Sequence, residues 1–306
     1  GNSVQEANLI NKLQGLSEIP LLISADFERG TAMRLEDGSL FPSNMGLGAT
    51  RNSELAYKMG LQIAKECRAI GIHQNYSPVV DVNNNPKNPI INVRSFGEDP
   101  ALVSQMGDAM IKGLQDGKVL ATAKHFPGHG DTDIDSHSDL PIINFGRDRL
   151  NSVELIPFKS AINSCVKSVM IAHLSFPAVD VTPFLPSSLS KKIVTDILIN
   201  DLNFKGLIVT DALNMKGITK HFTTEEVAVK CVEAGIDIIL MPQGEKNSID
   251  AILGAVGEGL FTEERINNSV RKILEAKKWA GAFENKTVDV SNVKNVVNSP
   301  EAKSLS

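Results

Sequence analysis

Residues 120–126 read LATAKHF, and the chain then continues as PGHGDTDIDSH over residues 127–137. The first stretch combines apolar and small residues without polar alternation, which is typical of a strand buried on both faces of a parallel sheet. Pro127 and the glycines after it break regular structure, so the second stretch is expected to be a loop. A buried strand that ends in Lys124 and His125 and opens into a polar loop indicates a functional site at its carboxyl end.

Five other runs share the character of this strand. They are PLLISAD (20–26), IHQNYSPVVDV (72–82), SVMIAHL (168–174), GLIVTD (206–211) and DIILM (237–241). Segments with apolar residues at helical spacing separate the runs, at 54–70, 101–115, 151–166, 189–202, 225–234 and 265–279. This alternation predicts right-handed strand-helix-strand units in a parallel sheet, which is either closed as a barrel or open and doubly wound.

The ends of the expected strands favour the barrel. Nearly every run ends in charged or hydrogen-bonding residues, namely Asp26, Asp81, Lys124 with His125, His173 and Asp211. In a barrel the carboxyl ends of all strands converge on one face, whereas in an open sheet only those beside a topological switch point do. We therefore predict an α/β fold of the (β/α)8 TIM-like barrel type and keep an open sheet as the alternative.

Composition and charge exclude several classes of protein. The chain has 306 residues and a net charge of -5, and its basic residues are scattered, so nucleic acid is not an expected partner. No stretch approaches the roughly 20 apolar residues of a membrane helix, so no membrane-spanning segment is expected. Cys67, Cys165 and Cys231 lie far apart. This spacing favours buried core thiols over a disulfide framework or a zinc site.

The segment 124–141 holds the densest group of ionisable residues, with three of the six histidines and four aspartates in eighteen residues. Burying so many such groups without partners would be costly, so we expect a functional loop. One possible chemistry is a zinc or iron site, with candidate ligands His125, His129, Asp131, Asp135 and His137. The segment lacks H-E-x-x-H on a helix, and Pro127 prevents a shared helical face, which makes a metal site the minor alternative.

A second chemistry for this loop is proton transfer by Asp135 and His137. A carboxylate beside an imidazole orients the ring and raises its basicity, which suits acid/base catalysis near neutral pH. The spacing of two residues lets both side chains point to the same side of an extended loop. We favour this interpretation over the metal site.

The run KHFPGHGDTDIDSH (124–137) closely resembles the signature of the β-N-acetylglucosaminidase branch of glycoside hydrolase family 3. Other motifs of that branch resemble segments of this chain in the same order. These are Asp26, Glu28, Gly30 and Arg34, then SPVVDVNNNP (77–86), RSFGEDP (94–100), VMIAH (169–173), GLIVTDALNM (206–215) and AGIDIILMP (234–242). The resemblance extends from Pro20 to about Phe283.

The resemblance implies roles for individual residues. Asp211 matches the nucleophile that forms a covalent glycosyl-enzyme, His137 matches a general acid/base on a mobile loop, and Asp135 matches its dyad partner. The residues that match groups holding the sugar hydroxyls and the N-acetyl group are Asp26, Arg34, Arg94, Lys124 and His125. A histidine acid departs from the paired carboxylic acids of most glycosidases.

The implied activity is hydrolysis, with retention, of terminal β-linked N-acetylglucosamine from cell-wall muropeptides or chitin-type oligosaccharides. The expected partner is a small carbohydrate substrate, and no metal or organic cofactor is needed. Within the family a β-glucosidase is an alternative, and so is a glycosyl phosphorylase, because a histidine acid/base repels phosphate less than a carboxylate would. A metal-dependent hydrolase and a catalytically silent sugar-binding barrel are more distant alternatives.

The resemblance also implies how the domain is bounded. A complete barrel has about eight strands, and the family's first two strand-helix units would lie before Gly1, so residues 1–285 are expected to form an N-terminally incomplete barrel domain. Residues 286–306 lose apolar periodicity and are expected to be a linker toward a possible C-terminal domain. The expected missing start would also remove a targeting signal, so cytoplasmic, periplasmic and secreted locations all stay open.

Overall fold

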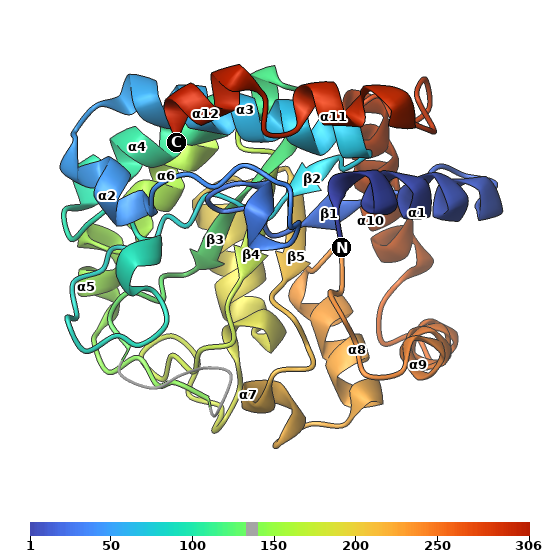
Figure 1. The fold of residues 1–306 in the computed structure, drawn as a ribbon. Coiled ribbons are helices and arrows are strands. Elements are labelled where there is room, and N and C mark those ends of the chain that lie inside the picture. The colour runs from blue at the N-terminus through green and yellow to red at the C-terminus, as the bar shows by residue number, and fades with distance from the viewer. Residues whose placement is uncertain (133–139) are drawn as a thin grey trace.

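A parallel sheet of five strands forms the centre of the computed structural model, which describes residues 1–132 and 140–306 (Figure 1). The strands are β1 (Ser24–Ala25), β2 (Gln74–Asn75), β3 (Leu120–Phe126), β4 (Ser168–Ile171) and β5 (Leu207–Thr210). Each strand pairs with the next one along the chain, and every pair is parallel. The predicted α/β fold with a parallel sheet is confirmed, and the sheet has the curvature of a half-barrel.

The sixth expected strand, at 237–241, does not form a strand in the structure. It makes one parallel bridge with β5, between Val209 and Ile238. Beyond the bridge, the N–H of Leu240 donates to the side-chain oxygen of Thr210 at 3.0 Å, in the place of a backbone carbonyl. This side-chain bond ends the ladder after one bridge, which explains the wrong prediction.

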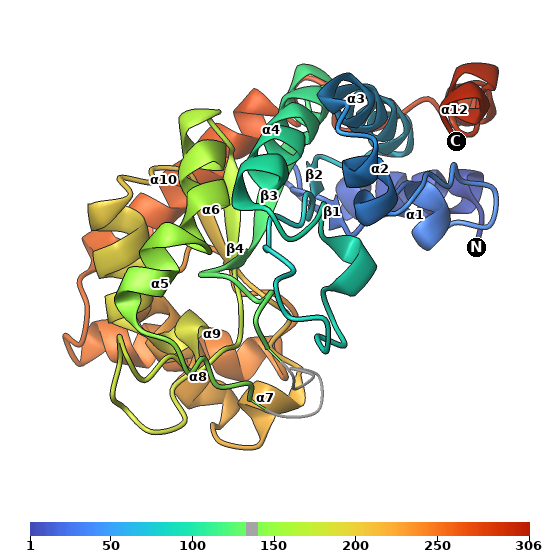
Figure 2. The same cartoon turned by 90° about the vertical axis from the view of Figure 1, so that its left-hand side faces the viewer.

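Long helices occupy the places that the apolar spacing predicts. They are α3 (Ser53–Ile70), α4 (Pro100–Asp116), α8 (Thr224–Ala234) and α10 (Glu263–Trp279). The side chains of Asn52, Asp99, Thr223 and Thr262 cap their amino ends. Figure 2 shows α3, α4 and α6 on the outer side of the sheet. These helices shield the sheet on one side and leave the carboxyl ends of the strands open to the loops.

Two expected helices differ from the prediction. Segment 151–166 holds the end of α5 (Arg147–Ser152) and the whole of α6 (Leu155–Asn163). The two helices are separate because Pro157 has no N–H to donate to the carbonyl of Val153. Segment 189–202 forms a π-helix over Lys192–Asp201. The remaining elements are α1 (Ser3–Leu16), α2 (Asn44–Ala49), α7 (Lys216–Thr219), α9 (Glu245–Gly257) and short 3-10 turns at Thr31–Met33, Asn92–Arg94 and Ser187–Leu189.

Residues 286–306, assigned above to a linker, pack on the domain. They form a 3-10 turn (Val290–Asn292), α11 (Val293–Val296) and α12 (Pro300–Leu305), which run along α3 in Figure 1. Val293, Val297 and Ala302 are buried in the main hydrophobic core. In the described part of the chain no helix is long and apolar enough to cross a membrane.

Candidate active site

A cavity of about 520 Å³ lies where the loops after β1, β3 and β5 meet. Six of the eight predicted site residues line it, namely Asp26, Arg34, Arg94, Lys124, His125 and Asp211. The other two, Asp135 and His137, lie outside the described residues. The structure thus brings together groups that are far apart in the sequence, as the convergence of strand ends leads one to expect.

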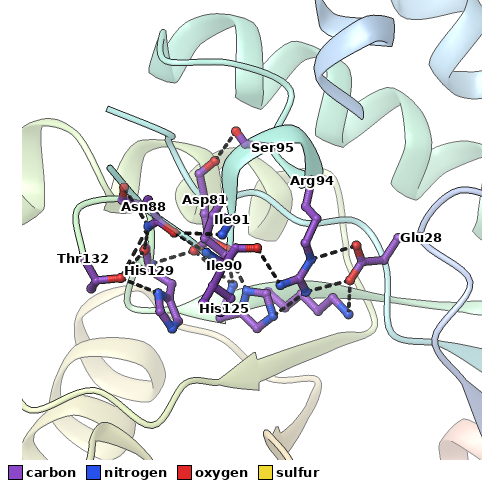
Figure 3. A network of polar contacts seen from close by, with 12 residues as sticks. Glu28, Asp81, Asn88, Ile90, Ile91, Arg94, Ser95, His125, His129 and Thr132 are labelled. Carbon is purple, nitrogen blue, oxygen red and sulfur yellow. Dashed lines mark hydrogen bonds and ion pairs between the residues drawn. The ribbon is translucent and has the colours of Figure 1, made fainter. Parts of the chain in front are cut away.

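An ionic network centred on Glu28 forms one wall of this cavity (Figure 3). The Lys124 Nζ lies 2.8 Å from Asp26 Oδ1 and 2.8 Å from Glu28 Oε1. Arg94 donates to both carboxylate oxygens of Glu28, through Nη2 at 2.8 Å and Nε at 3.0 Å. Burial alone would raise the pKa of Glu28, but Lys124 and Arg94 hold it well below its usual range. Glu28 therefore stays ionised and fixes both cations.

Asp81, which follows β2 and is fully buried, orients His125 from behind. The His125 Nδ1 lies 2.7 Å from Asp81 Oδ2, and its Nε2 lies 3.2 Å from Arg94 Nη2. A guanidinium can only donate, so Nε2 accepts and Nδ1 donates to Asp81. Burial opposes ionisation of Asp81, but His125 lowers the pKa of its carboxyl group. The ring of His125 is held between one carboxylate and one guanidinium at the cavity wall.

Asp211 directly follows β5 and is partly exposed to the cavity. Its Oδ1 accepts the Ala212 N–H at 2.8 Å, and its own N–H donates to Ile171 O at 2.9 Å. Burial would raise the pKa of this carboxyl group, but His125, His173 and the Ala212 N–H lower it. The buried His173 also contacts the Ala212 carbonyl, with Nε2 at 3.2 Å. Asp211 is thus an ionised carboxylate on a fixed backbone, suited to nucleophilic attack.

Arg34 lies at the rim of the cavity, just after the turn at Thr31–Met33, and is exposed. Glu28 and Asp81 are functional candidates to which sequence reasoning gave no role. Asp81 is the last residue but one of the run 72–82, close to the strand-end position that singled out Asp26 and Asp211. Glu28 lies two residues after Asp26, and its spacing alone does not reveal that it pairs with two cations.

The alternative of a metal site is not tested by the described residues. Within 1–132 and 140–306 no three His, Cys, Asp or Glu side chains are placed together as metal ligands. His125 and His129 lie near one another, with ring centroids 6.0 Å apart. Asp135 and His137 belong to the predicted ligand set but lie outside these ranges, so the metal alternative stays a prediction.

His129 provides a test of the buried site through pH. Burial and the neighbouring His125 lower its pKa from 6.5 to about 4. The unfolded state takes up a proton near pH 6.5 and the folded state only near pH 4, so stability is lost as the pH falls through this range. We expect His129→Asn to reduce the slope of the unfolding free energy against pH by up to about 1.4 kcal/mol per pH unit.

Urea denaturation at pH values from 4.5 to 6 measures this slope. His73, whose pKa burial also lowers to about 4, lies at the opposite, amino-terminal end of β2. His73→Asn should reduce the slope by a similar amount, and the two effects should add because the residues lie at different ends of the sheet. A slope that His129→Asn leaves unchanged would contradict a buried neutral imidazole.

Comparison with known proteins identifies the family. Residues 2–276 match the model of the glycosyl hydrolase family 3 N-terminal domain. The chain belongs to this family. This finding confirms the family that the motifs at 124–137 and 206–215 resemble.

Several proteins with known names are similar to this chain. The chain is 36% identical over 305 residues to "Beta-hexosaminidase A" of Pseudoalteromonas piscicida, a match that covers 90% of this chain and 51% of that protein. A family 3 β-N-acetylglucosaminidase from Paenibacillus sp. str. FPU-7 has a solved structure with TM-score 0.94 and 41% identity, covering 100% of this chain and 59% of that one. A solved β-glucoside phosphorylase has TM-score 0.94 and 30% identity, covering 99% and 56%. The chain spans about half the length of the curated relatives it matches.

Proposed function

We propose that this domain catalyses hydrolysis, with retention, of terminal β-linked N-acetylglucosamine in cell-wall muropeptides or chitin-type oligosaccharides. The observation that carries the proposal is the ionised carboxylate of Asp211, which faces a cavity walled by Asp26, Arg94, Lys124 and His125. Such a wall offers both hydrogen-bond donors and acceptors to sugar hydroxyls. The names of the P. piscicida and Paenibacillus relatives support the same substrate.

The mechanism follows from the charges of the cavity. Within the network, Asp26 and Glu28 balance Lys124 and Arg94, so Asp211 supplies the negative charge that faces an oxocarbenium-like transition state. Its oxygen forms a bond to the anomeric carbon as the bond to the leaving oxygen breaks. A water then attacks the same carbon and releases the sugar from Asp211.

Asp135 and His137 are the proposed acid/base pair for these two steps. His137 would give a proton to the leaving oxygen in the first step and take one from water in the second, with Asp135 stabilising the charged ring. This assignment rests on the resemblance of 124–137 to the family signature.

Glycosyl transfer to phosphate is a second candidate function, because of the likeness to the β-glucoside phosphorylase. Arg29 and Arg34, both exposed, line the cavity and could attract a phosphate ion. Phosphate would replace water in the second step and leave as the sugar 1-phosphate. Which acceptor is used therefore distinguishes the two functions.

A closed barrel is the proposed form of the whole domain. The described sheet has β1 at one edge and the bridge at Ile238 beside the other edge strand, β5. We propose a (β/α)8 TIM-like barrel, in which two further strand-helix units complete the sheet between β1 and Ile238. Under this proposal residues 1–285 belong to the catalytic barrel domain, and residues 286–306, which pack on α3, lead from it toward a further domain.

The proposed function predicts the preferred substrate of the complete protein, the effect of additives on its turnover, and its product. We expect release of 4-nitrophenol from 4-nitrophenyl N-acetyl-β-glucosaminide to exceed that from the β-glucoside, and to be unaffected by chelator or added phosphate. The product should be free N-acetylglucosamine with retained anomeric configuration, as followed by NMR. Formation of the 1-phosphate would instead favour the phosphorylase, and loss of turnover with chelator would favour a metal hydrolase. Binding without turnover would indicate a silent sugar-binding barrel.

A further inference from the structure

Asn88 is a buried asparagine whose amide joins two loops beside the cavity (Figure 3). Its Nδ2 donates to the carbonyls of His129 at 2.7 Å and Gly130 at 3.1 Å. Its Oδ1 accepts the N–H groups of Ile90 at 2.9 Å and Ile91 at 2.8 Å. Only 2 % of the residue is exposed, and every polar atom of its side chain is used. Asn88 itself does not line the cavity.

The acceptor side of Asn88 sets the turn that carries Arg94. The two N–H groups that Asn88 binds belong to residues 90 and 91 of this turn. The carbonyl of Ile90 accepts Arg94 Nη1 at 3.2 Å, and the carbonyl of Ile91 accepts the Arg94 N–H at 2.8 Å. Both the backbone and the guanidinium of Arg94 therefore depend on the position of this turn.

The donor side of Asn88 sets the loop after β3. The N–H of His129 donates to Asp81 Oδ1 at 2.7 Å, and the other oxygen of Asp81 holds His125. Gly130 lies so close to Val82 that a Cβ atom there would be 1.8 Å from the Val82 carbonyl oxygen. This packing leaves the loop little freedom to adjust if its bonds to Asn88 are lost.

We propose that Asn88 is a positioning residue for the glycosidase site, acting through Arg94 and His125. The inference rests on the proposed function, because it assigns these two groups to sugar binding. An amide side chain is required because it donates and accepts at the same time, whereas a carboxylate only accepts and an aliphatic side chain does neither. Asn88 thereby fixes the distance between the Arg94 turn and the loop after β3. His125, near the end of β3, has its Nε2 3.2 Å from Arg94 Nη2, so this contact depends on that distance.

The variant Asn88→Asp tests the donor role of the amide separately from its acceptor role. It keeps the acceptor for Ile90 and Ile91 but places a carboxylate oxygen against the carbonyls of His129 and Gly130. We expect kcat/KM for the aryl N-acetyl-β-glucosaminide to fall about 10- to 100-fold. Asn85→Asp is the matched control, because Asn85 Oδ1 accepts the Lys87 N–H at 2.9 Å and a carboxylate keeps this bond. It should change kcat/KM less than about twofold.

A double-mutant cycle with Arg94→Ala distinguishes positioning from a general structural role. If Asn88 acts through Arg94, Asn88→Asp should lower kcat/KM far less in the Arg94→Ala background than in the wild type. The same fold-loss in both backgrounds, with urea denaturation showing that all variants are folded, would overturn the proposal. So would an Asn88→Asp variant with unchanged kcat/KM.

A measurement without substrate separates this inference from the proposed function. The ring 15N chemical shifts of His125 report its contacts with Asp81 and Arg94 in the free protein. Asn88→Asp should shift the Nε2 resonance, and Asn85→Asp should leave it in place. If the wild type proves inactive, the proposed function fails, while this shift still decides whether Asn88 positions the His125 and Arg94 pair. Unchanged ring resonances in Asn88→Asp would reject it.

Discussion

Asp211→Asn is expected to lower kcat for the aryl N-acetyl-β-glucosaminide by about 10⁴-fold or more, with KM much less affected. Asparagine has nearly the same shape and still accepts the Ala212 N–H, so the cavity keeps its form. An amide oxygen without negative charge is a poor nucleophile for the anomeric carbon, so the covalent intermediate cannot form at a useful rate. Steady-state kinetics of the complete protein measures the loss.

Asp196→Asn is a suitable control for this variant. Asp196 is an exposed carboxylate on the π-helix, and removing its charge should leave kcat unchanged. Equal circular dichroism spectra and thermal midpoints for the three proteins would show that the loss is chemical. An Asp211→Asn protein within tenfold of the wild-type kcat would remove Asp211 from the nucleophile role.

Glu28→Gln is expected to lower the free energy of unfolding at pH 7.5 by about 3 kcal/mol. Glutamine cannot balance Lys124 and Arg94, which would remain buried or half-buried after losing the carboxylate that both of them contact. Activity should fall as well, because both cations would shift toward other acceptors. Urea denaturation measures the stability, and Glu54→Gln, at an exposed pair with Lys58, should change it little.

The pH dependence of this effect has a definite sign. The folded-state pKa of Glu28 lies well below its ordinary value of 4.5, so its stabilising effect is present above pH 4.5. It is lost as the pH falls from there through the folded-state pKa. The difference between the wild type and Glu28→Gln should therefore shrink in acid. A difference that grows below pH 4.5 would mean that the network is not what holds Glu28 ionised.

The sequence predicts the ends of strands and helices best where a single residue, such as a proline or a helix-capping residue, sets the end. The run at 120–126 has the bounds of β3 because Pro127 ends it, and the long helices begin beside capping Asn, Asp or Thr residues. The run at 237–241 fails because the side chain of Thr210, in a different strand, replaces a ladder acceptor. The hydrophobic periodicity of these two segments does not predict such a contact between distant residues.

The residues of the candidate site also divide into those that the sequence predicts and those that it does not. Strand-end position was enough to find Asp26, Lys124, His125 and Asp211, because parallel strands bring their carboxyl ends together. Glu28 and Asp81 act through partners that lie 44 or more residues away along the chain. Asn88 bonds to His129 and Gly130, which are 41 and 42 positions away. The strand-end position of Asp81 also points to the site but not to its partner His125, whereas the types and spacing of Glu28 and Asn88 are ordinary for turns. The roles of these three residues therefore follow only from the folded arrangement.

The order of the strands has a consequence for how the protein forms. Since β1 to β5 pair strictly in chain order, each strand can join the sheet as soon as it emerges during synthesis, with only its predecessor as template. The segment 286–306 does not follow this order, because its neighbours lie far back in the chain. It packs on α1 and α3, and Val288 and Asn11 are joined by two hydrogen bonds across 277 residues. Docking of this segment joins α1 to residues that are synthesised 277 positions later, so this part of the core can form only after strands β1 to β5 have been made.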